Sequence, residues 1–119
     1  MGLKPRKTTA PKWSEALEER VRVALGPRAD VAVRRMFGGL CFMVGGHMTV
    51  GLNGDELMAR VGPDAYENAL SLPGARPMDF TGRPLSGFVY VGDAGTSSQA
   101  AVREWVARCL SFTASLPKR

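Results

Sequence analysis

Residues 31–61 contain the clearest strand pattern in the sequence, and they read VAVRRMFGGL CFMVGGHMTV GLNGDELMARV. β-branched and aromatic residues alternate here with a period of two, and glycine pairs interrupt the run. Glycine and asparagine tolerate the positive φ that tight hairpins need. We therefore predict an antiparallel meander of strands at 31–37, 40–44, 47–52 and 56–61, with turns at Gly38-Gly39, Gly45-Gly46 and Asn53-Gly54.

Helical patterns lie on either side of the meander. Ser14 is a good N-cap for a helix whose apolar residues recur every three or four positions until Gly26 and Pro27 end it. Pro63 and Asp64 open a short helix that runs to Leu70.

The last third predicts a loop, a strand and a helix. Residues 72–84 carry three prolines and two glycines and are interpreted as a loop with at most a short strand at 78–80. Alternation over 85–91 predicts a further strand. Residues 96–99 form a capping-box pattern before a long amphipathic helix.

These elements predict a single α+β domain at residues 13–116, with helices packed on one face of a mainly antiparallel sheet. Residues 1–12 are expected to form a disordered basic arm, and 117–119 a tail. The expected core between the terminal helices and the sheet comprises Leu17, Val21, Phe88, Val102, Trp105 and Val106.

The net charge of +5 comes from the ends of the chain. Six Lys and Arg residues lie in 1–12 and 118–119, whereas between them ten arginines face eleven acidic residues, a net charge of −1. A basic DNA-reading face would need its positive excess in the folded body. Weak, non-specific nucleic-acid binding through the basic ends is therefore retained only as an alternative function.

Groups that commonly perform catalysis are scarce. His47 is the only histidine and is predicted at an exposed hairpin tip, and Cys41 and Cys109 are isolated thiols without zinc or redox spacing. We expect no enzyme activity, catalytic residue, metal or cofactor. Free thiols and the lack of a long apolar run favour a cytoplasmic protein without membrane contact.

Two arginine-containing segments form the candidate binding surface. Arg34 and Arg35 precede a glycine pair, while Arg76, Asp79 and Arg83 lie among rigid prolines. The second segment is an alternative ligand or enzyme site. In the structural interpretation, which we favour, Asp79 caps a turn or pairs with one of these arginines, and Phe80 fills the core.

Two ordered signatures carry a family resemblance. Residues 35–39 read RMFGG and residues 73–84 read PGARPMDFTGRP, followed by GFVYV at 87–91 and Trp105-Val106 in a helix. Together they resemble the amino-terminal domain of the TfoX/Sxy competence regulators. The resemblance implies a secretion-chaperone-like fold in the order helix, β-meander, helix, two strands, helix. It also implies a role in promoting DNA-uptake genes with a catabolite-activator-type regulator, although the second domain of full-length regulators has no counterpart in these 119 residues.

The scarcity of catalytic groups and the resemblance together favour a regulatory domain that binds a protein partner. Self-association as a homodimer is a further expectation, because an open sheet edge can be closed by a second copy.

Overall fold

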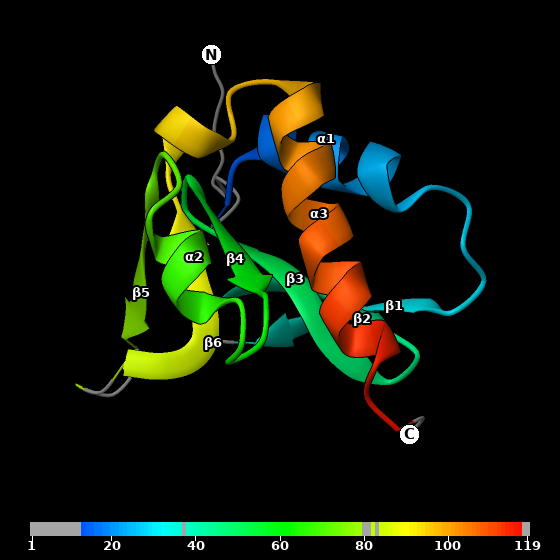
Figure 1. Cartoon of the computed structure of the whole chain (residues 1–119). Helices are drawn as coiled ribbons and strands as arrows, with labels where there is room; N and C mark the ends of the chain where they lie inside the picture. The colour runs from blue at the N-terminus through cyan, green and yellow to red at the C-terminus, as the bar shows by residue number, and fades with distance from the viewer. Residues whose placement is uncertain (1–12, 37, 80–81, 83, 118–119) are drawn as a thin grey trace, which may run out of the picture.

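The computed structural model describes residues 13–36, 38–79, 82 and 84–117, with the side chain of residue 84 left out. A six-stranded antiparallel sheet lies behind three helices (Figure 1). The elements in chain order are α1 (Glu15–Leu25), β1 (Val31–Met36), β2 (Gly39–Val44), β3 (His47–Asn53), β4 (Glu56–Arg60), α2 (Tyr66–Leu70), β5 (Ala75–Asp79), β6 (Pro84–Val91), the 3₁₀ turn η1 (Asp93–Gly95) and α3 (Gln99–Ala114). The α+β class and the element order predicted from the sequence are confirmed.

Serine residues cap both long helices, and the Ser14 cap was predicted. The capping box expected at 96–99 does not form, because Ser98 is the N-cap and the Gln99 side chain donates to the Arg20 carbonyl. The Ser14 hydroxyl accepts a hydrogen bond from the Leu17 amide, and Ser98 accepts one from Ala101, both at 3.1 Å. These bonds satisfy amides that would otherwise have no partner within the helix. None of the helices in the described part of the chain is long and apolar enough to cross a membrane.

The sheet has the order β1-β2-β3-β4-β6-β5, so the predicted meander occupies one side of it. Two turns are shifted by one residue from their predicted places, because Met36 pairs with Gly39 and Asn53 pairs with Glu56. Gly39 is therefore a strand residue. A Cβ there would overlap the carbonyl oxygen of Leu52, so close strand packing explains this glycine.

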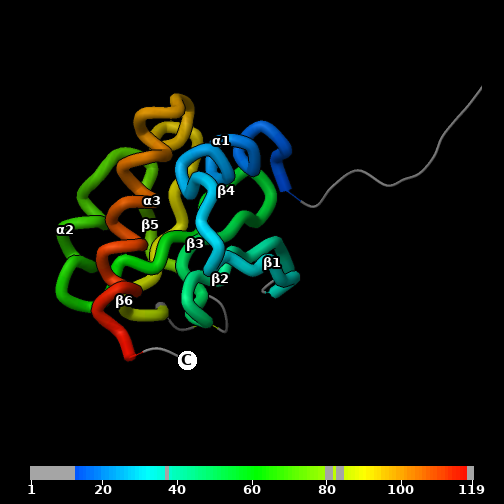
Figure 2. Tube along the Cα trace, turned by 90° about the vertical axis from the view of Figure 1, so that its right-hand side faces the viewer, coloured from blue at the N-terminus to red at the C-terminus, as the bar shows by residue number. Residues whose placement is uncertain are grey.

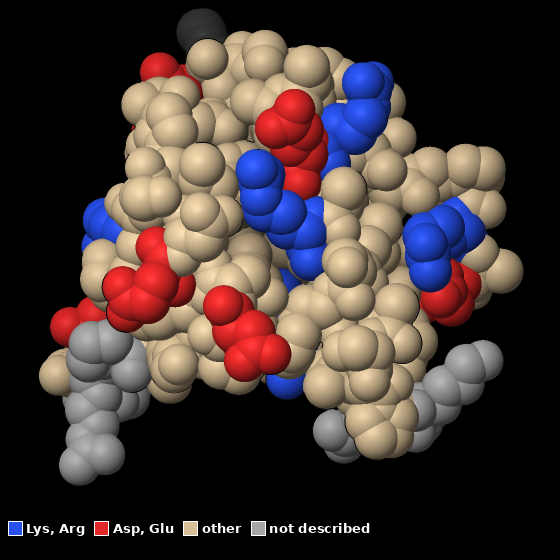
Figure 3. Space-filling view, in the orientation of Figure 1, with Lys and Arg blue, Asp and Glu red and all other residues tan. Residues whose placement is uncertain are grey.

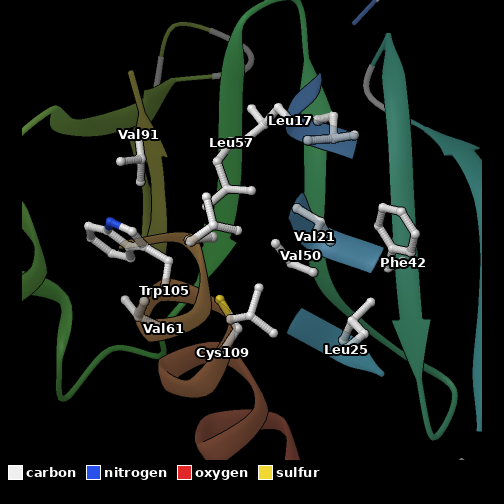
Figure 4. Close-up of a cluster of buried hydrophobic side chains, with 14 of the residues drawn as sticks. Leu17, Val21, Leu25, Phe42, Val50, Leu57, Val61, Val91, Trp105 and Cys109 are labelled. Carbon is white, nitrogen blue, oxygen red and sulfur yellow. The ribbon is translucent and has the colours of Figure 1, made fainter. Parts of the chain in front are cut away.

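All three helices contribute to a core against one face of the sheet, here called the helix face. Figure 4 shows α1 and α3 side chains meeting side chains from the strands. Trp105 is 3% exposed, and its neighbours in this core are mainly Leu and Val. Five of the six predicted core residues lie here: Leu17, Val21, Val102, Trp105 and Val106.

The sixth predicted core residue, Phe88, lies on the opposite face, so that part of the prediction is wrong. Neighbouring side chains of β6 alternate between faces: Val89 and Val91 join the helix face, whereas Phe88 and Tyr90 join a second apolar cluster. We call this side the methionine face, because its cluster contains Met36, Met43, Met48, Met58 and Met78, with Cys41, Leu85, Phe88 and Tyr90.

Residues 75–79, for which the sequence predicted a loop with at most a short strand at 78–80, form the edge strand β5. Pro77 fits there because an edge strand needs hydrogen bonds on one side only. The side chain of Met78 is fully buried in the methionine face. Phe80, the residue expected to fill the core, lies outside the described residues.

Candidate binding surface

Among the described residues, strand β1 forms one edge of the sheet and pairs only with β2. Figure 2 shows it at one side of the molecule, with no described element beyond it. Its residues Ala32 to Arg35 are all exposed. Val33 is 42% exposed, one of two large hydrophobic side chains prominent on the described surface. An exposed strand of this kind can pair with another extended chain.

The hydrogen-bond pattern determines which backbone groups of β1 point outward. The Gly45 amide donates to the Asp30 carbonyl at 3.0 Å, and hydrogen-bonded pairs alternate along an antiparallel ladder. The register then directs the backbone groups of Ala32 and Arg34 toward β2. The amides and carbonyls of Val31, Val33 and Arg35 consequently point away from the sheet.

The two candidate arginines of β1 lie on opposite faces. Arg34 pairs in register with Cys41 of the methionine face, and Arg35 pairs with Leu40 of the helix face. The Arg35 guanidinium lies over the Trp13 ring, 5.6 Å from its centroid. Because Arg34 and Arg35 are adjacent in a strand, they place one positive charge on each side of this edge of the sheet.

Arg76 and Asp79 lie on β5, at the far edge of the sheet from β1, and Arg83 lies outside the described residues. The five candidate residues thus do not form one site. Within the described part of the chain, Arg76 forms an ion pair with Glu56 of β4, whereas a pair with Asp79 was one alternative in the sequence interpretation. The Arg76 guanidinium donates two hydrogen bonds to Glu56, at 2.9 and 2.5 Å.

The Arg76–Glu56 pair spans strand β6, which lies between β5 and β4. The Arg76 guanidinium lies 4.6 Å from the centre of the Tyr90 ring on β6. Hydrogen bonding to Glu56 raises the pKa of Arg76 above its ordinary value. Sequence reasoning missed Glu56, although its alternation with Met58 and Arg60 along β4 places the three on one face.

The side chains that could take part in catalysis are two thiols and one imidazole, and each is either buried or in contact with another part of the chain. Burial raises the pKa of Cys41 to about 11 and that of Cys109 to about 12, so both thiols are protonated near neutral pH. The Nε2 atom of His47 lies 2.5 Å from the Pro117 carbonyl oxygen. In the described part of the chain, no three His, Cys, Asp or Glu residues form a group that could hold a metal.

Charges of both signs are distributed over the face seen in Figure 3, which is the side of the helices. Acidic and basic side chains lie next to each other there and leave no broad basic area. This mixture agrees with the net charge of −1 between residues 13 and 117. The helix side therefore lacks the continuous basic surface that phosphate backbones require.

In the described part of the chain, fold and surface define a small α+β domain whose sheet has one helix-covered face and two edge strands, β1 and β5. The sequence profile of the TfoX N-terminal domain matches residues 24–113, and the chain belongs to that family. Comparisons with curated proteins and with solved structures gave no significant match.

Proposed function

We propose that this domain is a non-catalytic regulatory module that binds a protein partner, and that the partner adds an extended strand to β1. The observation that carries the proposal is the open edge of β1, where Val31, Val33 and Arg35 direct backbone groups outward. Backbone hydrogen bonds supply affinity in such complexes, and alternate side chains supply specificity. Family membership supports a regulatory role, and control of competence genes belongs to the same proposal.

The opposite edge, β5, is less suited to pairing. Pro77 removes a backbone donor from β5, and the register of its pairing with β6 is irregular between Pro77 and Asp79. Both features are common means of protecting sheet edges. β1 contains no proline and has a regular register over all six residues. We therefore assign the partner to β1.

Charge favours an acidic partner strand. Arg34 and Arg35 flank β1 on its two faces, and no ion pair is found for either within the described chain. Glutamate or aspartate side chains on an added strand would lie opposite these guanidinium groups. A second copy of β1 would bring two more arginines to the same place, so we favour a different chain over a homodimer.

A capped peptide in which pairs of adjacent glutamates alternate with pairs of valines, so that glutamates lie on both faces of the added strand, tests this assignment by calorimetry. Val33→Pro removes an outward amide but no bond to β2, so the protein should stay folded while its affinity for the peptide falls at least about tenfold, or about 1.4 kcal/mol. Val33→Ala, which keeps the amide, is the matched control and should bind within about threefold of the wild type.

Replacing the glutamates of the peptide by lysines should abolish binding. Equal binding of the two peptides, or unchanged affinity in Val33→Pro, would overturn strand addition at β1. A dimer seen by light scattering that Val33→Pro dissociates would replace the foreign strand with a second copy of this chain.

A further inference from the structure

Every second side chain of β1 projects on the helix face. Val33 pairs in register with Phe42, and both Phe42 and Leu40, the partner of Arg35, belong to the core under the helices. Val33 is nevertheless 42% exposed, so this edge of the helix face is open. Val33 and Arg35 also direct their backbone groups away from the sheet. An added strand would therefore place its own side chains directly opposite Val33 and Arg35 on the helix face.

Trp13 is fixed beside this edge by contacts of its backbone and of its side chain. Its backbone forms a bridge to Gly54 in the β3–β4 turn, and the Ser14 amide donates to the Gly54 carbonyl at 2.8 Å. The indole Nε1 donates to Glu18 Oε1 of α1 at 2.9 Å. The ring is partly buried against the core of the helix face. These contacts determine the position of the Trp13 ring before any partner binds.

The fixed ring in turn holds the Arg35 side chain. The Arg35 guanidinium lies 5.6 Å from the centre of the Trp13 ring, which is within the range of cation–π attraction. An arginine over a ring keeps its N–H donors, at the rim of the planar group, available to a carboxylate. Arg34 has no ring contact among the described residues. Immobilising a free long side chain weakens binding by about two- to tenfold, so Arg35 should bind a carboxylate better than Arg34 does.

The nearby carboxylate of Glu18 is already paired with other groups. Its Oε1 accepts from Trp13, and its Oε2 accepts from Arg22 at 2.8 Å. The hydrogen bond from Trp13, together with that from Arg22, holds the pKa of Glu18 below its ordinary value, so Glu18 is ionised and balances the Arg22 charge. The ion pairs found in the described part of the chain do not include Arg35. These four side chains therefore leave one positive charge, at Arg35, two residues from the apolar Val33.

We infer that Arg35, positioned by Trp13, is the specificity-determining residue of the strand site, and that the partner strand runs antiparallel to β1 with a carboxylate opposite Arg35 and an apolar side chain opposite Val33. The assignment rests on the proposed strand addition at β1 and adds the sequence pattern of the partner. Its acidic and apolar residues lie two positions apart on one face of the added strand. An antiparallel direction continues the pairing of all neighbouring strands in this sheet. In the rival arrangement, the acid lies on the other face and pairs with Arg34.

Two capped peptides of identical composition, TETVTVT and TVEVTTT, separate these arrangements in titrations followed by the amide NMR signals of β1. Aligned antiparallel to β1, the first peptide puts its glutamate opposite Arg35 and a valine opposite Val33, whereas the second puts its glutamate opposite Arg34. TETVTVT should bind at least about threefold more tightly than TVEVTTT. Arg35→Gln should remove this preference, whereas Arg34→Gln should change the affinity for TETVTVT by less than about twofold.

Trp13 is tested as a positioning residue. Trp13→Leu should weaken the binding of TETVTVT about threefold and that of TVEVTTT by less than about twofold. Trp13→Phe keeps a ring and should restore most of the affinity for TETVTVT. In a protein that already carries Arg35→Gln, Trp13→Leu should have no further effect, because the two residues act together. A purely structural role of Trp13 would weaken both peptides equally and would overturn its assignment as a positioning residue.

Equal affinity of the wild type for the two peptides would overturn the inference, as would equal effects of Arg34→Gln and Arg35→Gln on TETVTVT. If Val33→Pro abolished the binding of both peptides in that case, strand addition would stand although the specificity of Arg35 had failed. Binding of neither peptide, or binding that Val33→Pro leaves unchanged, would overturn strand addition at β1 and the role of Arg35 with it.

Discussion

Both faces of the sheet bury apolar side chains, but they do so with different residue types. The helix face is filled by branched aliphatic residues and Trp105, under three helices. The methionine face has no helix over it among the described residues, yet Cys41, Met58 and Met78 are fully buried there. Branched side chains specify one shape, whereas unbranched methionines adapt to several. The comparison therefore suggests a rigid helix face and a more deformable methionine face.

Arginine–aromatic stacking helps to cover the methionine face in place of helices. Arg76 lies over Tyr90, and Arg60 lies over Phe88. Long arginine side chains can cover apolar surface while their charged ends stay in water. Gly51 leaves space for the Met58 side chain on this face, since a Cβ at Gly51 would come within 2.7 Å of the Met58 methyl group. Among the described residues, the sheet thus buries its second face with side chains from its own strands.

The largest expected loss is on the helix face. Trp105→Ala should lower the free energy of unfolding by about 3 to 5 kcal/mol, because it opens a large cavity between α3 and the sheet. Denaturant melts measure this loss. Val23→Ala is the control, since Val23 is 53% exposed and should change stability by less than about 0.5 kcal/mol. A loss below about 1 kcal/mol in Trp105→Ala would show that the helix face tolerates cavities.

Leu57 and Met58 compare the faces directly. They are neighbours on β4, both fully buried, and they point to opposite sides of the sheet. Both alanine variants should cost about 2 to 5 kcal/mol, with Leu57→Ala at the upper end because the methionine face can relax into the space. Chemical denaturation of the two variants gives the difference. A larger loss in Met58→Ala would reverse the assignment of the rigid face.

Each face also contains one buried thiol, Cys109 on the helix face and Cys41 on the methionine face. Burial raises their pKa values to about 12 and about 11, from an ordinary value of 9.0. Above about pH 9 the unfolded chain loses thiol protons that the folded protein keeps, so stability should fall as the pH rises toward 11. Below that pH the thiols make no pH-dependent contribution.

Urea melts between about pH 8 and 10.5 measure this slope. Cys109→Ala should flatten it more than Cys41→Ala does, because the Cys109 pKa is raised further. Identical slopes in the wild type and both variants would mean that groups other than the thiols control stability in this range.

The smallest expected effect on stability concerns Arg76, one of the arginine side chains that cover the methionine face. Glu56→Gln removes the partner of Arg76, whose side chain is 55% exposed, and should cost less than about 1 kcal/mol. Arg76→Ala should cost more, because it also uncovers Tyr90. Thermal melts at low and high salt separate the two effects, since added salt should reduce only the contribution of the ion pair. Equal losses in both variants would show that the stack contributes nothing.

Local chemistry in the sequence predicted most of the fold. Serine caps, glycine pairs and the change from a helical period to a period of two located both long helices and the four meander strands. The elements that were missed or displaced depend on distant contacts. Prolines suggested a loop at 72–84 with at most a short strand at 78–80, but pairing with β6 makes all of 75–79 a strand. Gly39 was assigned to a turn, although its tight contact with Leu52 places it in β2.

The candidate site was less predictable than the fold. Alternation along β6 separated Phe88 and Tyr90 from Val89 and Val91, but it could not show which pair faces the helices. Arg34 and Arg76 were identified as separate segments, and only the strand order shows that they lie at opposite edges. The Arg76–Glu56 pair joins residues 20 positions apart across an intervening strand, and no local pattern encodes that contact.

Five of the six methionines in the sequence lie on one face of the sheet, which gives that face a distinct redox chemistry. Peroxide converts a thioether to a sulfoxide, and the side chain becomes polar. Met36 and Met43 are partly buried and should oxidise first, whereas Met58 and Met78 can react only when the sheet opens. The order in which the five sulfoxides accumulate would therefore record how often each part of this face becomes accessible to solvent in the folded protein.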